Sequence, residues 1–164
     1  MHFILPRRFA EVFQISQDYP GTLPQQQTVR DALTFVFGSR EHQLLKRLDT
    51  STNTVWKRSY LVVSFMPEDM FGPNQLALAG VSGISFRDTF AVSALYDQTR
   101  HEYMHIVDKQ LLTPANRLWF MEQAGIDPNI NTWNHNVQET WAEAGRDWLD
   151  GRGWESLTGI LLPG

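Results

Sequence analysis

The sequence predicts a single α+β domain in which a small, mostly antiparallel sheet precedes a helical C-terminal half. Short runs rich in β-branched and aromatic residues between residues 54 and 87 indicate the strands, and a period of 3.6 after about Ser93 indicates the helices. A chain of 164 residues has the size of one domain. We therefore expect one unit over residues 1–164, of which the part before about residue 50 carries no assignable motif.

The composition is typical of a soluble globular protein and disfavours two classes of partner. Hydrophobic residues make up 42% of the chain and charged residues 20%. The net charge of -4, without runs of Lys or Arg, gives no electrostatic reason to expect a nucleic acid or an anionic membrane. No apolar run approaches the roughly 20 residues of a membrane span. The opening MHFILPRRFAEVF does not match a secretory signal, so we expect a cytoplasmic protein.

Three short strands are predicted before the helical half. Residues 54–66, TVWKRSYLVVSFM, indicate a strand whose second half is buried on both faces. Residues 75–80 and 83–87 indicate two strands joined by a tight turn through Ser82 and Gly83. These last two strands should form a hairpin.

Helical segments flank the strands on both sides. Residues 28–48 carry apolar residues at helical spacing and should cover one face of the sheet, with a bend or break at Gly38. In TPANRLWFMEQAG, Thr113 is expected as the N-cap and Pro114 as the first helical residue, with a glycine just past the end. A last helix should end before Gly151.

The hexapeptide RHEYMH carries the most chemical content in the chain. On a helix, His101 and His105 lie one turn apart, so their imidazoles can converge on one ion. Glu102 points about 100° from His101, a direction suited to taking a proton from a water molecule on that ion. Because the chain has no cysteine, any metal must be held by histidine and carboxylate side chains.

The two histidines are expected to lie off the main core face of their helix. His101, His105 and Asp108 fall on a stripe about 160 to 200° from the apolar one. The apolar stripe comprises Val92, Tyr96, Tyr103, Val107 and Leu111. A polar, solvent-facing helix that binds no metal is the alternative interpretation.

A third ligand must come from elsewhere in the chain. The motif continues as HIVDKQLLTP, without the glycine and third histidine of the metzincin pattern. Further on, NHNVQETWAEAGRDWL places Glu139 and Glu143 one helical turn apart. Here the chain resembles the gluzincin zinc metallopeptidases, in which HExxH lies on one helix and a glutamate on a later helix completes the site. The matching parts are HEYMH and ETWAE.

This resemblance implies a zincin-like fold, a size close to that of minigluzincins, and a Zn²⁺ site. It implies His101, His105 and Glu139 as ligands and Glu102 as general base. Glu143 would accept a hydrogen bond from the outer nitrogen of a ligating histidine and so fix its tautomer.

The resemblance also implies a peptide or protein substrate, held along an edge strand before the active-site helix. In the family this strand pairs with the substrate backbone by β-augmentation. The residues expected to do so are Leu78, Ala79, Gly80 and Val81.

The role of Glu139 depends on where its helix begins. If Asn136 is the N-cap, Asn136 and Glu139 can form a capping box, and the glutamate merely closes the start of the helix. If the helix starts at Thr132 or Asn134, Glu139 lies inside it and is free to bind metal. Both starts are compatible with the sequence.

Two further polar residues have alternative roles. His135 precedes Glu139 by four residues, so it could replace it as a ligand or donate to the transition state, and we favour the donor role. Asp108 could orient a histidine or be an ordinary acid near the helix end.

The sequence therefore predicts a zinc-dependent peptidase that hydrolyses peptide bonds through a metal-activated water with Glu102 as general base. The alternative is a non-catalytic zincin-like module, in which a metal-stabilised or vestigial site serves a binding or structural role. A fourth protein ligand, for example His135, would favour the module, because structural zinc sites are closed.

Overall fold

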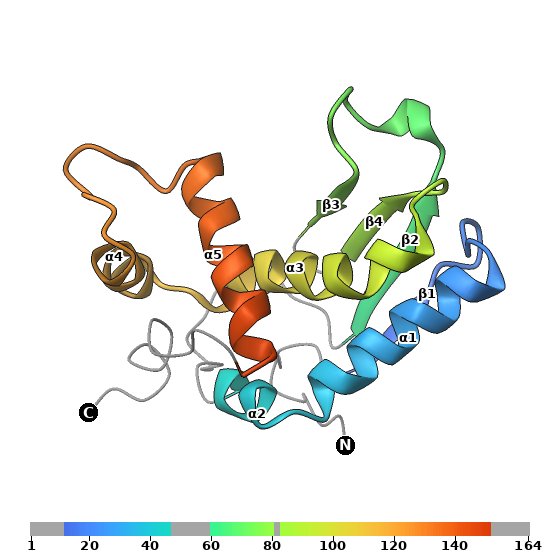
Figure 1. Cartoon of the computed structure of the whole chain (residues 1–164), viewed down its shortest axis with the longest axis horizontal. Coiled ribbons are helices and arrows are strands. Elements are labelled where there is room, and N and C mark those ends of the chain that lie inside the picture. Colours follow the sequence, from blue (N-terminus) through green and yellow to red (C-terminus); the bar gives the residue numbers. More distant parts are fainter. Residues whose placement is uncertain (1–11, 47–59, 81–82, 152–164) are drawn as a thin grey trace, which may run out of the picture.

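A four-stranded mixed sheet lies to one side of a group of helices in this computed structural model, which describes residues 12–46, 60–80 and 83–151 (Figure 1). The strands are β1 (Val12–Ile15), β2 (Tyr60–Met66), β3 (Ala77–Ala79) and β4 (Gly83–Arg87). The helices are α1 (Leu23–Phe37), α2 (Arg40–Lys46), α3 (Val92–Leu111), α4 (Pro114–Gln123) and α5 (His135–Leu149), with a 3-10 turn η1 at Glu68–Met70. The predicted α+β class is confirmed.

The expectation of a mostly antiparallel sheet is wrong. The strand order is β1-β2-β4-β3, and only the β3–β4 pair is antiparallel, whereas β1 pairs with β2 and β2 pairs with β4 in parallel. The chain passes from β1 to β2 through α1 and α2, and such a helical crossover brings the next strand back in the same direction. Strand β1 lies in the segment to which no motif could be assigned.

Strand β2 is fully buried on one face only, which corrects the prediction of burial on both. Leu61, Val63 and Phe65 are buried, while the alternate residues of the strand are partly exposed. This is the alternation of a sheet that is covered by helices on one side. Residues 54–59 of the predicted strand lie outside the described residues.

The hairpin before the helical half is confirmed by the pairing of β3 with β4. Ala77 lies opposite Phe86, and Ala79 lies opposite Ile84. The hairpin places β3 at the edge of the sheet, beside α3 (Figure 1). Residues 81–82 of the predicted turn lie outside the described residues.

The predicted helix boundaries are largely confirmed. Helix α1 ends at Phe37, and α2 begins after Gly38, so the predicted break is present, although Thr22 starts α1 earlier than expected through a capping box with Gln25. Thr113 caps α4 through the backbone N–H of Asn116, and α4 begins with Pro114 as predicted.

Helix α3 is the centre of the fold, and its histidine stripe is not off the core as expected. Every residue from Thr99 to Asp108 is buried. Helices α1 and α5 both pack against α3, and glutamates of α5 lie against the histidines of the stripe opposite the apolar one. The solvent-facing interpretation of RHEYMH is therefore wrong. Among the described helices, none is long and apolar enough to cross a membrane.

Candidate metal centre

Helices α3 and α5 bring two histidines and one glutamate together. The Nε2 atom of His101 lies 3.0 Å from Oε2 of Glu139, and Nε2 of His105 lies 2.9 Å from Oε1 of the same carboxylate. The imidazole rings are buried, with centroids 5.0 Å apart and planes 77° from each other. Each oxygen of Glu139 thus faces one imidazole.

His101, Glu102 and His105 form a buried group whose ligand atoms lie within 4.8 Å of one another, close enough to hold a metal ion. Nitrogen and oxygen donors of this kind suit zinc and several other divalent ions. The helical spacing alone brings these three residues together, since all of them belong to α3.

Glu102 is a buried carboxylate held at the floor of a cleft. Burial raises the pKa of its carboxyl above the ordinary value, and the hydrogen bond from Gln98 Nε2, 2.9 Å away, partly opposes that rise. Smaller influences on this pKa come from His101 and Lys109, which lower it, and from Glu139, which raises it. A carboxylate with a raised pKa is a better proton acceptor near neutral pH than an exposed one.

Burial has the opposite effect on the histidine one turn further along α3. It lowers the pKa of His105, and the neighbouring carboxylate of Glu139 opposes this change. The neutral imidazole is favoured by burial. Neutral imidazole is also the form that binds metals.

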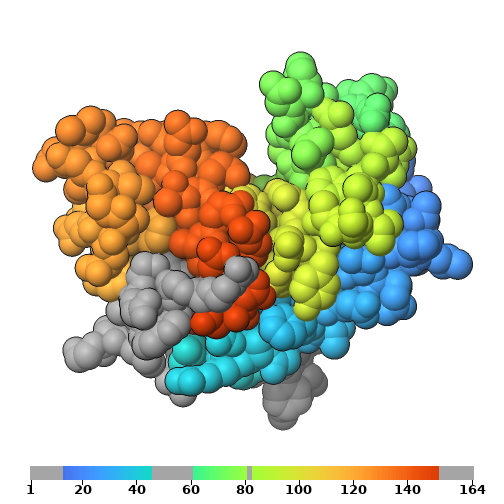
Figure 2. All heavy atoms as spheres, viewed as in Figure 1, coloured from blue at the N-terminus to red at the C-terminus, as the bar shows by residue number. Residues whose placement is uncertain are grey.

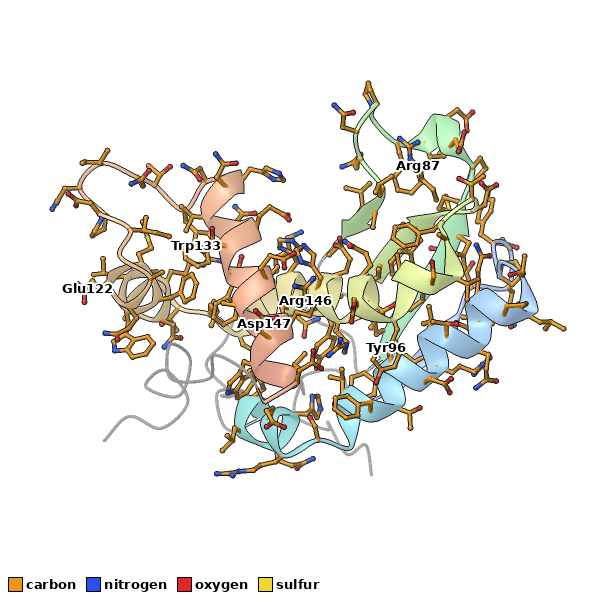
Figure 3. The ribbon with its side chains drawn as sticks, in the orientation of Figure 1. Arg87, Tyr96, Glu122, Trp133, Arg146 and Asp147 are labelled. Atoms are coloured by element: carbon orange, nitrogen blue, oxygen red, sulfur yellow. The ribbon has the colours of Figure 1, made fainter. Side chains whose placement is uncertain are left out.

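A series of charged side chains on α5 begins at the outer nitrogen of His101, Nδ1. Oε1 of Glu143 lies 2.9 Å from Nδ1 of His101, which is within ion-pair distance. The two groups are not aligned for a hydrogen bond. The other oxygen of Glu143 lies 2.6 Å from Nη2 of Arg146, which is also 3.6 Å from Asp147 (Figure 3). Glu143 therefore lies beside the outer nitrogen of His101, without the hydrogen bond that was expected of it.

The start of α5 decides the local role of Glu139. The N-cap is Asn134, whose side chain accepts from the backbone N–H of Val137 at 3.0 Å. Asn136 lies inside the helix, so the capping box with Glu139 does not form. Helical spacing places His135, the first residue of α5, on the same face as Glu139, and both line the cleft.

The cleft has a volume of about 660 Å³ and lies between β3 and α5, with α3 as its floor. Figure 2 shows it as a notch between the orange α5 region and the green β3 region. Four polar residues of the floor, Gln98, Glu102, His105 and Lys109, follow one line along α3. Their spacing of four, three and four residues puts them on one face of the helix.

The wall opposite α5 is an open strand edge. In the ladder with β4, Leu76 and Gly80 bond to Arg87 and Gly83. The alternation of an antiparallel pair then turns the N–H and C=O groups of Ala77 and Ala79 toward the free edge.

The residues expected to hold substrate are only partly brought to this wall. Leu78 and Ala79 line the cleft, together with Leu76, Ala77 and the turn at residues 72–75. Gly80 is bonded within the hairpin and does not line it. Val81 lies outside the described residues.

The Asp108 carboxylate binds Arg117 and Trp133 rather than a histidine, so it does not have the predicted role of orienting one. Its Oδ1 accepts from Nε of Arg117 at 2.8 Å, and its Oδ2 accepts from the indole N–H of Trp133 at 2.9 Å. Arg117 also lies over the Trp133 ring, 5.4 Å from its centroid. Asp108 instead joins the end of α3 to α4 and to the loop before α5.

Sequence reasoning missed three residues that organise the site. Gln98 lies four residues before Glu102, and Arg146 lies three after Glu143, so helical spacing could have indicated both. Arg87 gave no local signal. Its guanidinium bonds to the carbonyl oxygens of Gly72 and Gln75 and so holds the turn at the rim of the cleft (Figure 3).

Comparison with known proteins gives no relative for this chain. No family model matches it, and no curated protein or solved structure matches it significantly. The site must therefore be interpreted from its own geometry.

Proposed function

We propose that this chain is a zinc-dependent peptidase in which His101, His105 and Glu139 hold Zn²⁺ and Glu102 is the general base. The observation that carries the proposal is the carboxylate of Glu139, whose two oxygens face the Nε2 atoms of both histidines at 3.0 and 2.9 Å. The two histidines come from one helix and the glutamate from another, as in the gluzincins that the sequence resembles.

The spacing of the donor atoms fits a small tetrahedral ion. Zn–N and Zn–O bonds of about 2.0 to 2.1 Å at tetrahedral angles separate neighbouring ligand atoms by about 3.3 Å. The two nitrogen-to-oxygen distances here, 3.0 and 2.9 Å, are slightly shorter, so the donors need to move apart by only a few tenths of an ångström. When bound, Zn²⁺ supplies the Lewis acidity that activates water and polarises a carbonyl group.

Glu102 suits the transfer of protons better than ligation. Its Oε1 accepts a hydrogen bond from Gln98, and its side chain lines the cleft where a substrate would lie. Glu139, in contrast, directly faces both imidazoles. Glu102 would take the proton from the attacking water and deliver it to the nitrogen of the leaving amine as the C–N bond breaks.

The free edge of β3 supports a peptide as the substrate. The N–H and C=O groups of Ala77 and the N–H group of Ala79 point away from β4 and can pair with an extended chain. Such a chain would lie in the cleft above Glu102 and His105, within reach of the general base and the metal ligands.

A non-catalytic metal-binding module is the second candidate, because His135 lines the same cleft on the same face of α5 as Glu139. As a fourth ligand it would close the site and leave no position for water. As a donor to the transition state it would instead support catalysis.

Metal analysis tests the ligand set. The purified protein should bind about one zinc ion per chain, and His101→Ala and Glu139→Ala should lose most of it. Glu122→Ala, which removes an exposed glutamate of α4 (Figure 3), is the matched control and should retain full zinc content. Full zinc content in Glu139→Ala would refute Glu139 as a ligand.

A peptide-library assay with mass-spectrometric detection tests the chemistry. Zinc-loaded protein should cleave peptides, and Glu102→Gln should lose at least about a hundredfold in rate while keeping its zinc. If the wild type cleaves nothing while zinc content and affinity fall in His135→Ala, the closed structural module is the better description.

A further inference from the structure

Lys109 provides a positive charge in a cleft that is otherwise lined by acids and neutral groups. It is the last of the four residues that line the floor along α3. Glu102 and Glu139 contribute the two carboxylates of the cleft. Within the described ranges, no carboxylate lies at ion-pair distance from Lys109. Its charge acts on Glu102 from farther away, as the smallest of the influences on the pKa of that carboxyl.

The Lys109 ammonium is held at the open edge of β3. It donates a hydrogen bond to the carbonyl oxygen of Ala79, one of the groups that face away from β4. An ammonium group has three donors, so two remain for other partners. A peptide that pairs along β3 would therefore find the Ala79 acceptor taken and would meet a positive charge in its place.

The position of Lys109 along α3 sets its distance from the reacting bond. Lys109 follows His105 by four residues, which corresponds to about 6 Å along a helix axis. An extended peptide advances about 3.3 Å per residue, so this distance spans about two residues. For a peptide that runs along α3 with its scissile bond at the proposed metal ligand His105, a group bound by Lys109 would thus lie about two residues from that bond.

We propose that Lys109 and the Ala79 end of β3 form a subsite for a carboxylate of the peptide substrate, about two residues from the scissile bond. This inference rests on the proposed peptidase function and adds a preference for acidic groups. The carboxylate can be an Asp or Glu side chain within a longer peptide or the free C-terminus of a short one. Both place the same anionic group against the ammonium, so the test must separate them.

Binding to the uncleaving, zinc-loaded Glu102→Gln protein separates this inference from catalysis. The probes are fluorescent decapeptides in which a single Glu is moved through the sequence, a matching series with Gln, and each peptide with a free or an amidated C-terminus. Fluorescence anisotropy should show that one Glu position, or the free C-terminus, tightens binding roughly 10- to 150-fold, the range expected for a charge-assisted hydrogen bond.

Lys109→Gln in the same background should abolish this preference, because its amide can still donate to Ala79 but carries no charge. Any loosening of β3 weakens Glu and Gln peptides alike, so the ratio of their affinities isolates the charge. Arg40→Gln, which removes an exposed cation of α2, is the control and should leave the ratio unchanged.

The comparison of Glu with Gln peptides, the comparison of free with amidated C-termini and the effect of Lys109→Gln together distinguish the possible failures. Equal binding of Glu and Gln peptides and of both C-terminal forms, or no measurable binding of any probe, would overturn the subsite. A preference that survives in Lys109→Gln would overturn it as well. A preference that is lost in Lys109→Gln, in a protein whose wild type cleaves nothing, would support the subsite and contradict only the peptidase proposal.

Discussion

Trp141 donates its indole N–H to the carbonyl oxygen of Met104 at 2.7 Å, in the buried contact between α5 and α3. Met104 lies between the two histidines of α3, and Trp141 lies between Glu139 and Glu143 of α5. This hydrogen bond therefore sets the position of the glutamates relative to the histidines. A metal site that is shared by two helices depends on such a fixed contact.

Replacing Trp141 with Phe should lower both stability and metal affinity. The variant loses the hydrogen bond to Met104, which contributes about 1 kcal/mol to the free energy of unfolding, and it leaves a small void. Denaturant unfolding of the metal-free protein measures the first effect, and a competitive zinc titration measures the second. Trp119→Phe, on α4, should leave zinc affinity unchanged. Loss of stability with unchanged zinc affinity in Trp141→Phe would contradict the role assigned to this contact.

Gly145 allows α5 to approach α3 closely at the next turn. A Cβ atom at this position would lie 2.4 Å from Cε and 2.6 Å from Cγ of Met104. We expect Gly145→Ala to cost about 1 to 3 kcal/mol of unfolding free energy, because the helices or Met104 must shift. In a Met104→Ala background the same substitution should cost much less. Equal costs in both backgrounds would show that the clash is relieved in another way.

Glu143 should tune zinc affinity without being a ligand. Its contact with Nδ1 of His101 favours the tautomer that presents Nε2 to the ion, and loss of such a contact commonly weakens metal binding by about 10- to 100-fold. Zinc titration of Glu143→Ala checks this, with Glu122→Ala as control. Arg146→Gln, which removes the ion-pair partner of Glu143 but leaves the Glu143 carboxylate in place, should have a smaller effect in the same direction. Stoichiometric zinc with unchanged affinity in Glu143→Ala would exclude the role.

Asp108 should matter for folding but not for the metal. Asp108→Asn weakens a buried link to Arg117 and Trp133, and we expect a loss of about 2 to 4 kcal/mol in unfolding free energy. Zinc affinity of the folded protein should stay within about twofold of the wild type, because the carboxylate oxygens contact neither histidine. A large loss of zinc affinity at unchanged stability would instead support a role of Asp108 in orienting a histidine.

The buried carboxyl of Glu102 should destabilise the metal-free protein at neutral pH. Because burial raises its pKa in the folded state, the folded protein takes up this proton at a higher pH than the unfolded chain. Unfolding free energy therefore rises as the pH falls through the folded pKa. Glu102→Gln carries no charge, so in the presence of a chelator it should melt a few degrees above the wild type at about pH 7.5. The difference should narrow toward about pH 5.

That narrowing distinguishes a charge effect from a packing effect. A general improvement in packing in Glu102→Gln would raise the melting temperature by the same amount at both pH values. A variant that is less stable than the wild type at neutral pH would show that the hydrogen bond from Gln98 outweighs the cost of burial.

Local signals predicted the parts of the fold that depend on neighbouring residues. Thr113 and Pro114 were sufficient to place the start of α4, and Gly38 placed the break between α1 and α2. In the site, the spacing of His101 and His105 placed both imidazoles on one side of a helix. The spacing of Glu139 and Glu143 did the same for the carboxylates, although only the structure brings the two helices together.

Long-range pairing could not be predicted in the same way. Strand β1 is four residues long and pairs in parallel with β2, a contact that no turn or local period announces. The start of α5 at Asn134 rather than Asn136 is a choice between two equally good caps. The clamp of Arg87 on the turn at residues 72–75 depends on a hairpin register that is fixed only in the folded chain.

The enclosure of the β3 edge also bears on how copies of this chain behave toward one another. An unpaired strand edge on an outer surface is a template for edge-to-edge association and aggregation. Here the free groups of β3 open into a cleft walled by α5, and Lys109 occupies one of them. A single extended segment can enter such a space more readily than the broad edge of another folded sheet. The wall that would hold a peptide thus also protects the protein from self-association along this edge.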